Sequence, residues 1–211
     1  MSEKSHSWAT PSPAGLVALA MACFTFFALL TGKITPASSG LMGIWLLGGF
    51  AVQIIVGIVE LKEGNILAGN IFTFFSAFFM LVTGLEFIFK FFASVNGWKI
   101  DAHVDGWGWL PLAAAVTLWA PAYLKSPKCL FGVVISLTPA LWIISFMDMG
   151  VWPHEMAPIA GWLAFSGGTF GVYTSAAVIL NTAFGRSILP MGAPFIKPQP
   201  VSNPVSGSKS A

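Results

Sequence analysis

The side chains of this chain that are suited to chemistry are uncharged and lie inside long apolar runs. Gln53 is in the middle of one run, and Asn70 and Thr73 share a face of the next. Thr138 adds a hydroxyl group to a later run. Polar groups inside a membrane span are costly, and they either bond a neighbouring helix or contact a solute. These residues predict a path for a small polar solute or interhelical hydrogen bonds, and both interpretations stay open.

The sequence contains none of the residue groups that would indicate an enzyme. It has no H-E-x-x-H, no G-x-S-x-G, no phosphate-binding loop and no pair of acids inside a run. His6, His103 and His154 all lie outside the runs. The loop Asp101-Ala-His103-Val-Asp105 is the one candidate for metal binding or pH sensing, and a solvated loop is the simpler interpretation. We expect no enzymatic activity, no cofactor, no metal and no nucleic-acid partner.

Six apolar runs must position the polar groups. The chain is 56% hydrophobic and only 9% charged, which leaves no room for a soluble catalytic domain. A helix needs about 20 apolar residues to cross a bilayer, whereas barrel strands of about ten alternating residues do not fit runs that are apolar on every side. We therefore predict an all-α integral membrane protein with six transmembrane helices, at Gly15–Leu30, Gly40–Val59, Ile66–Phe89, Trp109–Leu124, Cys129–Phe146 and Met156–Leu180.

The basic residues predict how the chain is oriented in the membrane. One side of the predicted bundle has Lys4, Lys62, Lys125, Lys128, Arg186, Lys197 and Lys209, and the other has only Lys33, Lys90 and Lys99. Cytoplasmic loops carry the excess of Lys and Arg. We therefore expect both termini to lie in the cytoplasm. We also expect a multi-pass protein of the cell membrane, in particular a bacterial inner membrane. The side poor in basic residues holds an expected interfacial belt of Trp98, Trp107, Trp109 and Trp152.

The chain has one predicted domain between two tails. Residues 1–9 form a polar N-terminal tail, and residues 10–192 form the six-helix transmembrane domain. Residues 193–211 are rich in Pro, Ser and Gly and lack periodicity. That composition predicts a disordered C-terminal tail.

Small residues recur on one face of the last run. Gly161, Ala164, Gly168, Gly171 and Ser175 follow one another at steps of three, four, three and four residues, which puts them on one helical stripe. Such a stripe lets another backbone approach closely. Both helix packing and the lining of a narrow path explain it.

Three segments together resemble the acetate uptake transporter family, also called succinate–acetate permeases. The first is Thr10-Pro11-Ser12-Pro13-Ala14-Gly15-Leu16, where the family's usual motif is Asn-Pro-Ala-Pro-Leu-Gly-Leu. The other two are Glu60–Asn65, and Ala160-Gly161-Trp162 followed by Phe184-Gly185-Arg186. The resemblance covers nearly the whole chain except the tails. It implies a six-helix subunit, a homo-hexamer, and a pore through each subunit for acetate or other small carboxylates such as succinate or lactate, often coupled to protons.

The resemblance also implies which residues form the pore. An apolar constriction would be built by Leu19, Phe75 and Leu137, one residue from each of three helices. Gln53 and Gly171 match positions beside the path, to which Asn70, Thr73 and Thr138 are added from their place in the runs. Thr10, Pro11, Pro13 and Gly15 carry the N-terminal motif. Leu19 and Phe75 stand where an aromatic residue and a tyrosine are common, so the constriction is expected to be drier than usual.

Two function classes follow from the sequence. The first is membrane transport of acetate and related small carboxylates, either as an anion channel or as a proton symporter. The alternative is a neutral-solute channel for urea, amides or ammonia, a family of similar size that lacks the Pro-x-Pro motif and the Phe-Gly-Arg end. A scaffold or sensor is allowed by the tails, but no residue argues for it.

Overall fold

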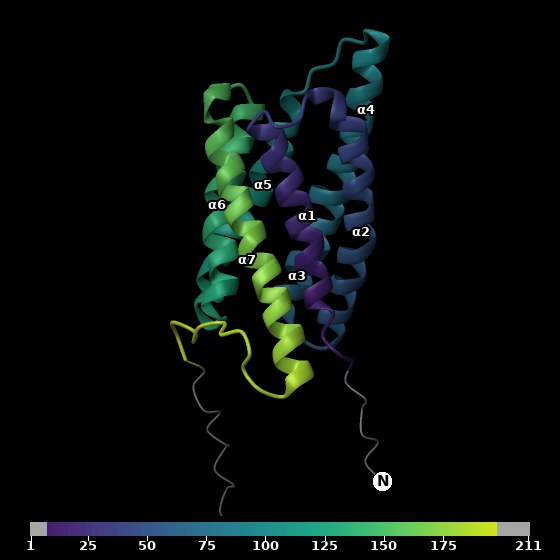
Figure 1. Cartoon of the computed structure of the whole chain (residues 1–211). Coiled ribbons are helices and arrows are strands. Elements are labelled where there is room, and N and C mark those ends of the chain that lie inside the picture. The colour runs from purple at the N-terminus through teal and green to yellow at the C-terminus, as the bar shows by residue number, and fades with distance from the viewer. Residues whose placement is uncertain (1–7, 198–211) are drawn as a thin grey trace, which may run out of the picture.

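The structure is a computed structural model that describes residues 8–197, and it is a bundle of long helices throughout. Residues 1–7 and 198–211, which make up most of the two predicted tails, lie outside the described residues. Figure 1 shows the helices running side by side along one long axis. The prediction of an all-α chain is confirmed for the described part.

The helices form six rods, because some consecutive helices continue one another. The elements are α1 (Ser12–Leu30), η1 (Pro36–Ser38), α2 (Ser39–Lys62), α3 (Ile66–Phe74), η2 (Phe75–Val82), α4 (Thr83–Asn96), α5 (His103–Trp119), η3 (Ala120–Lys125), α6 (Lys128–Asp148), η4 (His154–Met156) and α7 (Ala157–Phe184). The third rod is α3, η2 and α4, and the fourth is α5 and η3. Within the described residues, every rod except α5 is long and apolar enough to cross a membrane. Outward-facing Leu41, Ile44, Trp45 and Ile55 are exposed, as suits contact with lipid. The chain is a multi-pass membrane protein.

The third rod changes its winding in the middle. It runs from Ile66 to Asn96, and its central part, η2, is π-helical. The hydroxyl groups of Ser76 and Thr83 donate to the carbonyls of Thr73 (2.7 Å) and Phe78 (3.1 Å) at its two ends. π-Helical turns are rare and often lie at functional sites. Here the turn begins at Phe75, one of the predicted constriction residues.

The fourth rod departs most from the predicted span of Trp109–Leu124. Its α-helix begins earlier, at His103, and ends at Trp119, and the 3-10 segment η3 follows. Pro121 explains this end, since proline lacks the N–H group that the helix needs. The prediction that Trp109 lies in an interfacial belt is wrong, because Trp109 is buried against Phe26 and Phe79.

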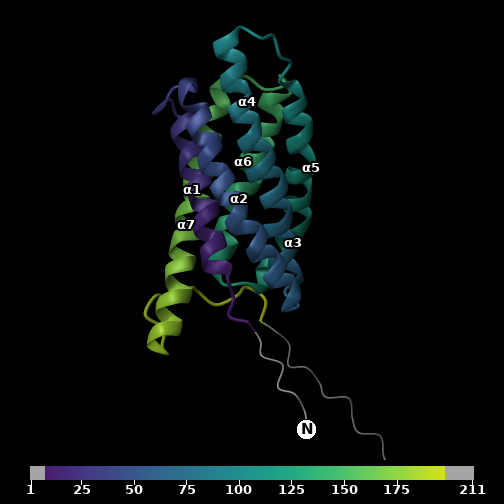
Figure 2. The same cartoon turned by 90° about the vertical axis from the view of Figure 1, so that its right-hand side faces the viewer.

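The rods enclose the interior of the bundle as a ring. Helix α1 packs between α2 and α7, α6 packs between α5 and α7, and α2 also contacts α3 and α4. Large side chains reach across between the third rod and α5, with ring centroids 5.3 Å apart for Phe74 and Trp119. Figures 1 and 2 show α1 and α2 alongside the third rod from two directions. We call the end of the bundle with Ser12 and Lys62 the base, and the opposite end, with Leu30 and Asn96, the top.

The stripe of small residues on α7 brings this helix close to α1. A Cβ atom built on Gly168 would lie 2.9 Å from Cβ of Cys23. The Ser175 hydroxyl donates to the Pro13 carbonyl (2.9 Å), which fixes the base end of the same contact. The predicted close approach of another backbone is therefore confirmed, with α1 as the partner.

Part of the predicted C-terminal tail packs against the base. The Ile196 N–H donates to the Leu124 carbonyl (3.0 Å), and the Phe195 ring lies 5.3 Å from that of Phe131. The carbonyls of Met191 and Gly192 accept from the N–H groups of Cys129 and Lys128 (3.1 and 3.3 Å). The segment that follows α7 thus satisfies donors at the start of α6, where helix N–H groups have no partner within the helix.

Candidate functional site: a cavity inside the bundle

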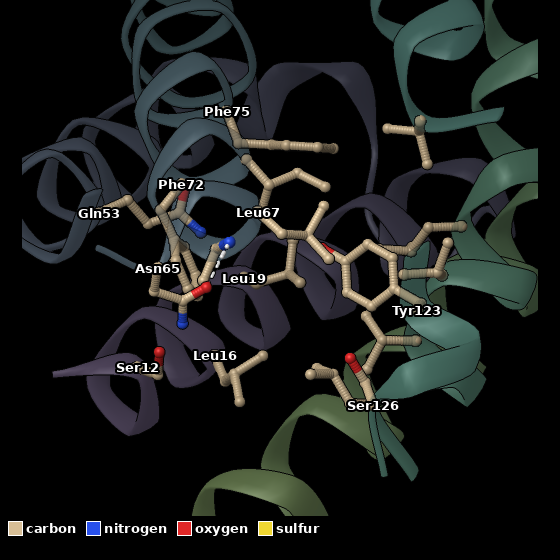
Figure 3. Close-up of a pocket in the computed structure, with 17 residues that line it drawn as sticks. Ser12, Leu16, Leu19, Gln53, Asn65, Leu67, Phe72, Phe75, Tyr123 and Ser126 are labelled. Atoms are coloured by element: carbon tan, nitrogen blue, oxygen red, sulfur yellow. Dashed lines mark hydrogen bonds between the residues drawn. The ribbon is translucent and has the colours of Figure 1, made fainter. Parts of the chain in front are cut away.

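A cavity of about 140 Å³ lies inside the bundle toward the base. This is far more than the roughly 15 Å³ that one water needs, so the cavity accommodates a small molecule. Its polar lining residues are Ser12, Gln53, Asn65, Tyr123 and Ser126. The rest of its wall is apolar and comes from α1, α3, η2, α5 and α6: Leu16, Leu19, Leu67, Ala68, Ile71, Phe72, Phe75, Val116, Leu130, Val133, Val134 and Leu137 (Figure 3).

A second, smaller cavity of about 20 Å³ lies farther toward the top. Its wall is wholly apolar and includes Cys23, Phe26, Phe79, Leu141 and Ile144, each one or two helical turns nearer the top than the wall of the first cavity. Three residues line both cavities: Leu19, Phe75 and Leu137. They lie at the boundary between the two, on α1, η2 and α6.

The structure thus brings the three predicted constriction residues together inside the bundle. Leu19 and Phe75 are buried, and Leu137 is half-buried against Gly167 of α7. None of them faces the outer surface. Their role as the constriction of a pore stays a prediction.

Gln53 is the one predicted path residue that lines the cavity. It is fully buried, and its Nε2 donates to the carbonyl of Gly15 over 3.3 Å. Its Oε1 has no hydrogen-bond partner within the described part of the chain. Few buried polar atoms are left unpaired in folded proteins, so this amide has bonding capacity that the protein itself does not use.

The other predicted path residues lie away from the cavity walls. The side chains of Asn70, Thr73 and Thr138 donate to carbonyls of their own helices, those of Ile66, Gly69 and Val134. Serine, threonine and asparagine in a helix readily bond the carbonyl one turn earlier, and this satisfies them without a solute. Gly171 faces α1, where a Cβ atom would lie 3.3 Å from the Leu16 carbonyl oxygen. It therefore serves helix packing in this structure.

The N-terminal motif is held by a buried carboxylate, Glu60. Its Oε1 accepts from the hydroxyl groups of Thr10 (2.6 Å) and Ser12 (2.7 Å), and its Oε2 accepts from Nδ2 of Asn65 (2.8 Å). Glu60 is only 4% exposed although it is an acid. Three donors from two other parts of the chain therefore meet at the end of α2 and join the start of α1 to the turn before α3.

The prolines and the glycine of the motif set the start of α1. Pro11 precedes the helix, and Pro13 lies in its first turn, where a missing N–H costs nothing. Gly15 is needed for packing, because a Cβ atom there would lie 2.6 Å from Cε1 of Phe72. The motif thus brings α1 close to α3 at the base of the cavity.

Among the polar residues of the cavity, sequence reasoning did not single out Tyr123 and Ser126, at the end of the fourth rod, and it placed Ser12 and Asn65 only within motifs. Neither Tyr123 nor Ser126 belongs to a recognisable motif. The only signal was a tyrosine inside an apolar run two residues after Pro121, in the segment where the α-helix has ended.

Two groups of charged residues near the top are paired. Lys90 of α4 contacts Glu86 one turn earlier and Oδ2 of Asp105 on α5 (2.5 Å). Asp101 instead accepts from the backbone N–H of His103 and pairs with its ring, and these bonds hold the pKa of the Asp101 carboxyl below its usual range. The described residues contain no group of three His, Cys, Asp or Glu that could hold a metal ion.

Comparison with known proteins identifies relatives of the same size. No family model matches the chain. It is 28% identical over 195 residues to proteins named succinate-acetate/proton symporter SatP from Escherichia coli (strain K12) and Shigella flexneri, over 87% of this chain and 95% of theirs. A solved structure described as that of the bacterial acetate channel SatP aligns with a TM-score of 0.77 at 23% identity, over 88% of this chain and 99% of that one. The resemblance to the acetate uptake transporter family is confirmed.

Proposed function

We propose that this chain transports acetate and related small carboxylates across a cell membrane, through the interior of its own helix bundle. The relatives named as a succinate-acetate/proton symporter and an acetate channel support this substrate class. They do not favour the alternative of a urea or ammonia channel. A transporter or channel, not an enzyme, is the function class that they indicate.

The observation that carries the proposal is the pair of cavities that share Leu19, Phe75 and Leu137. Three side chains from three separate rods separate a larger chamber with polar groups from a smaller dry one. Among the described residues, neither wall includes a charged side chain. Such a site binds a solute weakly enough for it to leave again, as conduction requires.

The chemistry of a small carboxylate fits this arrangement. Carboxyl groups titrate near pH 4, so acetate is almost wholly ionised at neutral pH. Moving a bare anion into an apolar medium carries a large desolvation penalty. A short apolar boundary limits the distance over which the anion lacks polar partners, and the methyl group of acetate suits that boundary.

Uptake into liposomes that contain the purified protein tests the proposal. Labelled acetate, succinate and urea are compared with and without a pH gradient, against protein-free liposomes. We expect saturable acetate uptake and no urea uptake. Stimulation by an inward proton gradient would indicate symport, and its absence would indicate passive conduction. Urea flux without acetate flux would refute the proposal.

We also infer that six subunits assemble as a ring, each with its own path. The family resemblance implies this number. Large apolar side chains on the outer face of α2, among them Leu41, Ile44 and Trp45, are available for a neighbouring subunit as well as for lipid. Native mass spectrometry of the detergent-solubilised protein measures the subunit number directly, and a monomer at micromolar concentration would contradict the inference.

A further inference from the structure

The polar groups of the larger cavity divide into those already bonded and those still free. The Ser12 hydroxyl and the Asn65 amide both donate to Glu60, and Oδ1 of Asn65 accepts from the Ala68 N–H (3.2 Å). The Gln53 amide donates to the Gly15 carbonyl. Within residues 8–197, the hydroxyl groups of Tyr123 and Ser126 have no hydrogen-bond partner. The cavity therefore retains two uncommitted donors, both from the fourth rod.

Tyr123 is the deeper of these two donors. It is only 5% exposed, and its ring belongs to the apolar core of the bundle. Figure 3 shows Tyr123 on the opposite side of the cavity from Gln53, with its hydroxyl directed toward the centre. Ser126 is less buried and lies nearer the base.

The Tyr123 hydroxyl opens onto the cavity and has no partner within the described protein, which is unfavourable unless a molecule in the cavity bonds it. A tyrosine usually finds a partner for its hydroxyl when it is buried. If Tyr123 served packing alone, phenylalanine would do so equally well and would leave no donor unpaired. A hydroxyl held in an apolar chamber is instead suited to a solute that brings its own acceptor oxygen.

We propose that Tyr123 is a specificity-determining residue of the transport path, whose hydroxyl donates a hydrogen bond to a carboxyl oxygen of the solute on the base side of Leu19, Phe75 and Leu137. This inference rests on the proposed function and names the polar contact within it. The hydroxyl anchors the carboxyl end, while the apolar wall around it accepts the methyl end. A solute without a carboxyl group, such as urea, gains less from this arrangement, because the apolar wall leaves its other polar atoms without partners.

The chain offers a matched pair of variants, because it contains only two tyrosines, Tyr123 and Tyr173. Tyr173 lies outside the cavity, and its hydroxyl donates to the Pro190 carbonyl (2.7 Å). Uptake of labelled acetate into liposomes is measured for the wild-type protein, Tyr123→Phe and Tyr173→Phe. We expect the KM for acetate to rise about tenfold in Tyr123→Phe, as the loss of one hydrogen bond predicts, with the KM of Tyr173→Phe unchanged.

A binding measurement on the wild-type protein does not depend on the folding of Tyr123→Phe. Tyrosine labelled with ¹³C at Cζ gives one NMR signal for each of the two residues, and Tyr173→Phe assigns both signals because it lacks one of them. We expect added sodium acetate to shift the Tyr123 signal saturably and to leave the Tyr173 signal in place. Sodium chloride at equal ionic strength should shift neither.

The two measurements decide the inference separately from the proposed function. If wild-type liposomes take up acetate but either the KM of Tyr123→Phe is unchanged or the Tyr123 signal does not move, the assignment of Tyr123 is wrong. If wild-type liposomes take up no acetate, the proposed function fails, and Tyr123 is then judged by its NMR signal alone.

Discussion

Glu60 is a buried carboxylate whose three observed partners are neutral donors. Thr10, Ser12 and Asn65 satisfy its two oxygens and come from the start of α1 and the turn before α3. Hydrogen bonds to a charged acceptor are stronger than those between neutral groups. Glu60 therefore links three segments at the base, and two of its partners, Ser12 and Asn65, also line the cavity.

Replacing Glu60 by alanine should loosen the base. The change leaves the donors of Thr10, Ser12 and Asn65 without an acceptor, and we expect it to lower the free energy of unfolding by about 1–3 kcal/mol. Unfolding in mixed detergent micelles measures the effect. Glu63→Ala is the control, because Glu63 is exposed and, within residues 8–197, accepts only from the Trp8 N–H (2.9 Å). Equal losses of unfolding free energy in the two variants would show that the hydrogen bonds of Glu60 do not stabilise the base.

Leu137 is the half-buried member of the predicted constriction, and shortening it should join the two cavities. We expect Leu137→Ala to raise the uptake of lactate relative to acetate by roughly tenfold, since removing a steric block from a tight site changes selectivity by this amount. Liposome uptake of the two labelled solutes measures the ratio. Leu163→Ala is the matched control, because Leu163 is also partly buried but lines neither cavity. A lactate-to-acetate uptake ratio equal to that of the wild type would show that Leu137 does not line the transport path.

The sequence predicted correctly that some residues, such as Gln53, face the interior of the bundle, but it did not predict this for others, such as Tyr123. Runs that are apolar on every side carry no periodicity that tells the inner face from the outer one. Gln53 could be placed because a mid-span amide needs a polar surrounding, whereas Asn70 and Thr138 satisfy themselves on their own helices. Tyr123 cannot be told from the other aromatic residues of the runs by sequence alone, because its position in the cavity depends on how the fourth rod folds.

At the scale of elements, close packing of α2 and α3 builds one wall beside the cavity. A Cβ atom on Gly57 would lie 2.9 Å from the backbone nitrogen of Thr73, and one on Gly69 would lie 2.8 Å from that of Leu61. Backbone atoms cannot give way as flexible side chains do. These two glycines therefore set how closely the helices approach each other.

Gly57→Ala should separate α2 from α3. We expect the free energy of unfolding to fall by about 1–3 kcal/mol, the usual cost of overpacking, together with a lower rate of acetate uptake because Gln53 lies one turn away on the same helix. Gly48→Ala is the control, since a Cβ atom there meets no other heavy atom within 4 Å. Unfolding in detergent and liposome uptake are measured for both. Equal losses in Gly48→Ala would show that α2 needs glycine for another reason.

The positions of most rods were predictable from hydropathy, but their internal irregularities were not. The π-helical turn of η2 lies wholly within an apolar stretch, where α and π winding present the same residue types. The beginning of α5 was missed because Asp105 and His103 are polar, although both belong to its first turn. Length and composition reveal a transmembrane span, but they do not reveal where its winding changes from α to π or 3-10.

At the scale of the whole molecule, the two ends of the bundle differ in charge. Among the described residues, the base holds Lys62, Lys125, Lys128, Arg186 and Lys197, and the top holds Lys33, Lys90 and Lys99. Lys90 is neutralised by Glu86 and Asp105, so the top has still less free positive charge than the count suggests. Each basic residue near an anionic cytoplasmic leaflet contributes about 1 kcal/mol of attraction.

This asymmetry predicts that the base, and with it both ends of the described chain, faces the cytoplasm. Single cysteines are introduced at Ser94, near the top, and at Ser187, near the base, after Cys23 and Cys129 are replaced by alanine; both serines are exposed. In spheroplasts of bacteria that express the protein, a membrane-impermeant maleimide should label Ser94→Cys at once and Ser187→Cys only after permeabilisation. The reverse pattern would invert the orientation. It would then place the Tyr123 chamber on the outer side of the constriction, where an incoming carboxylate meets it first.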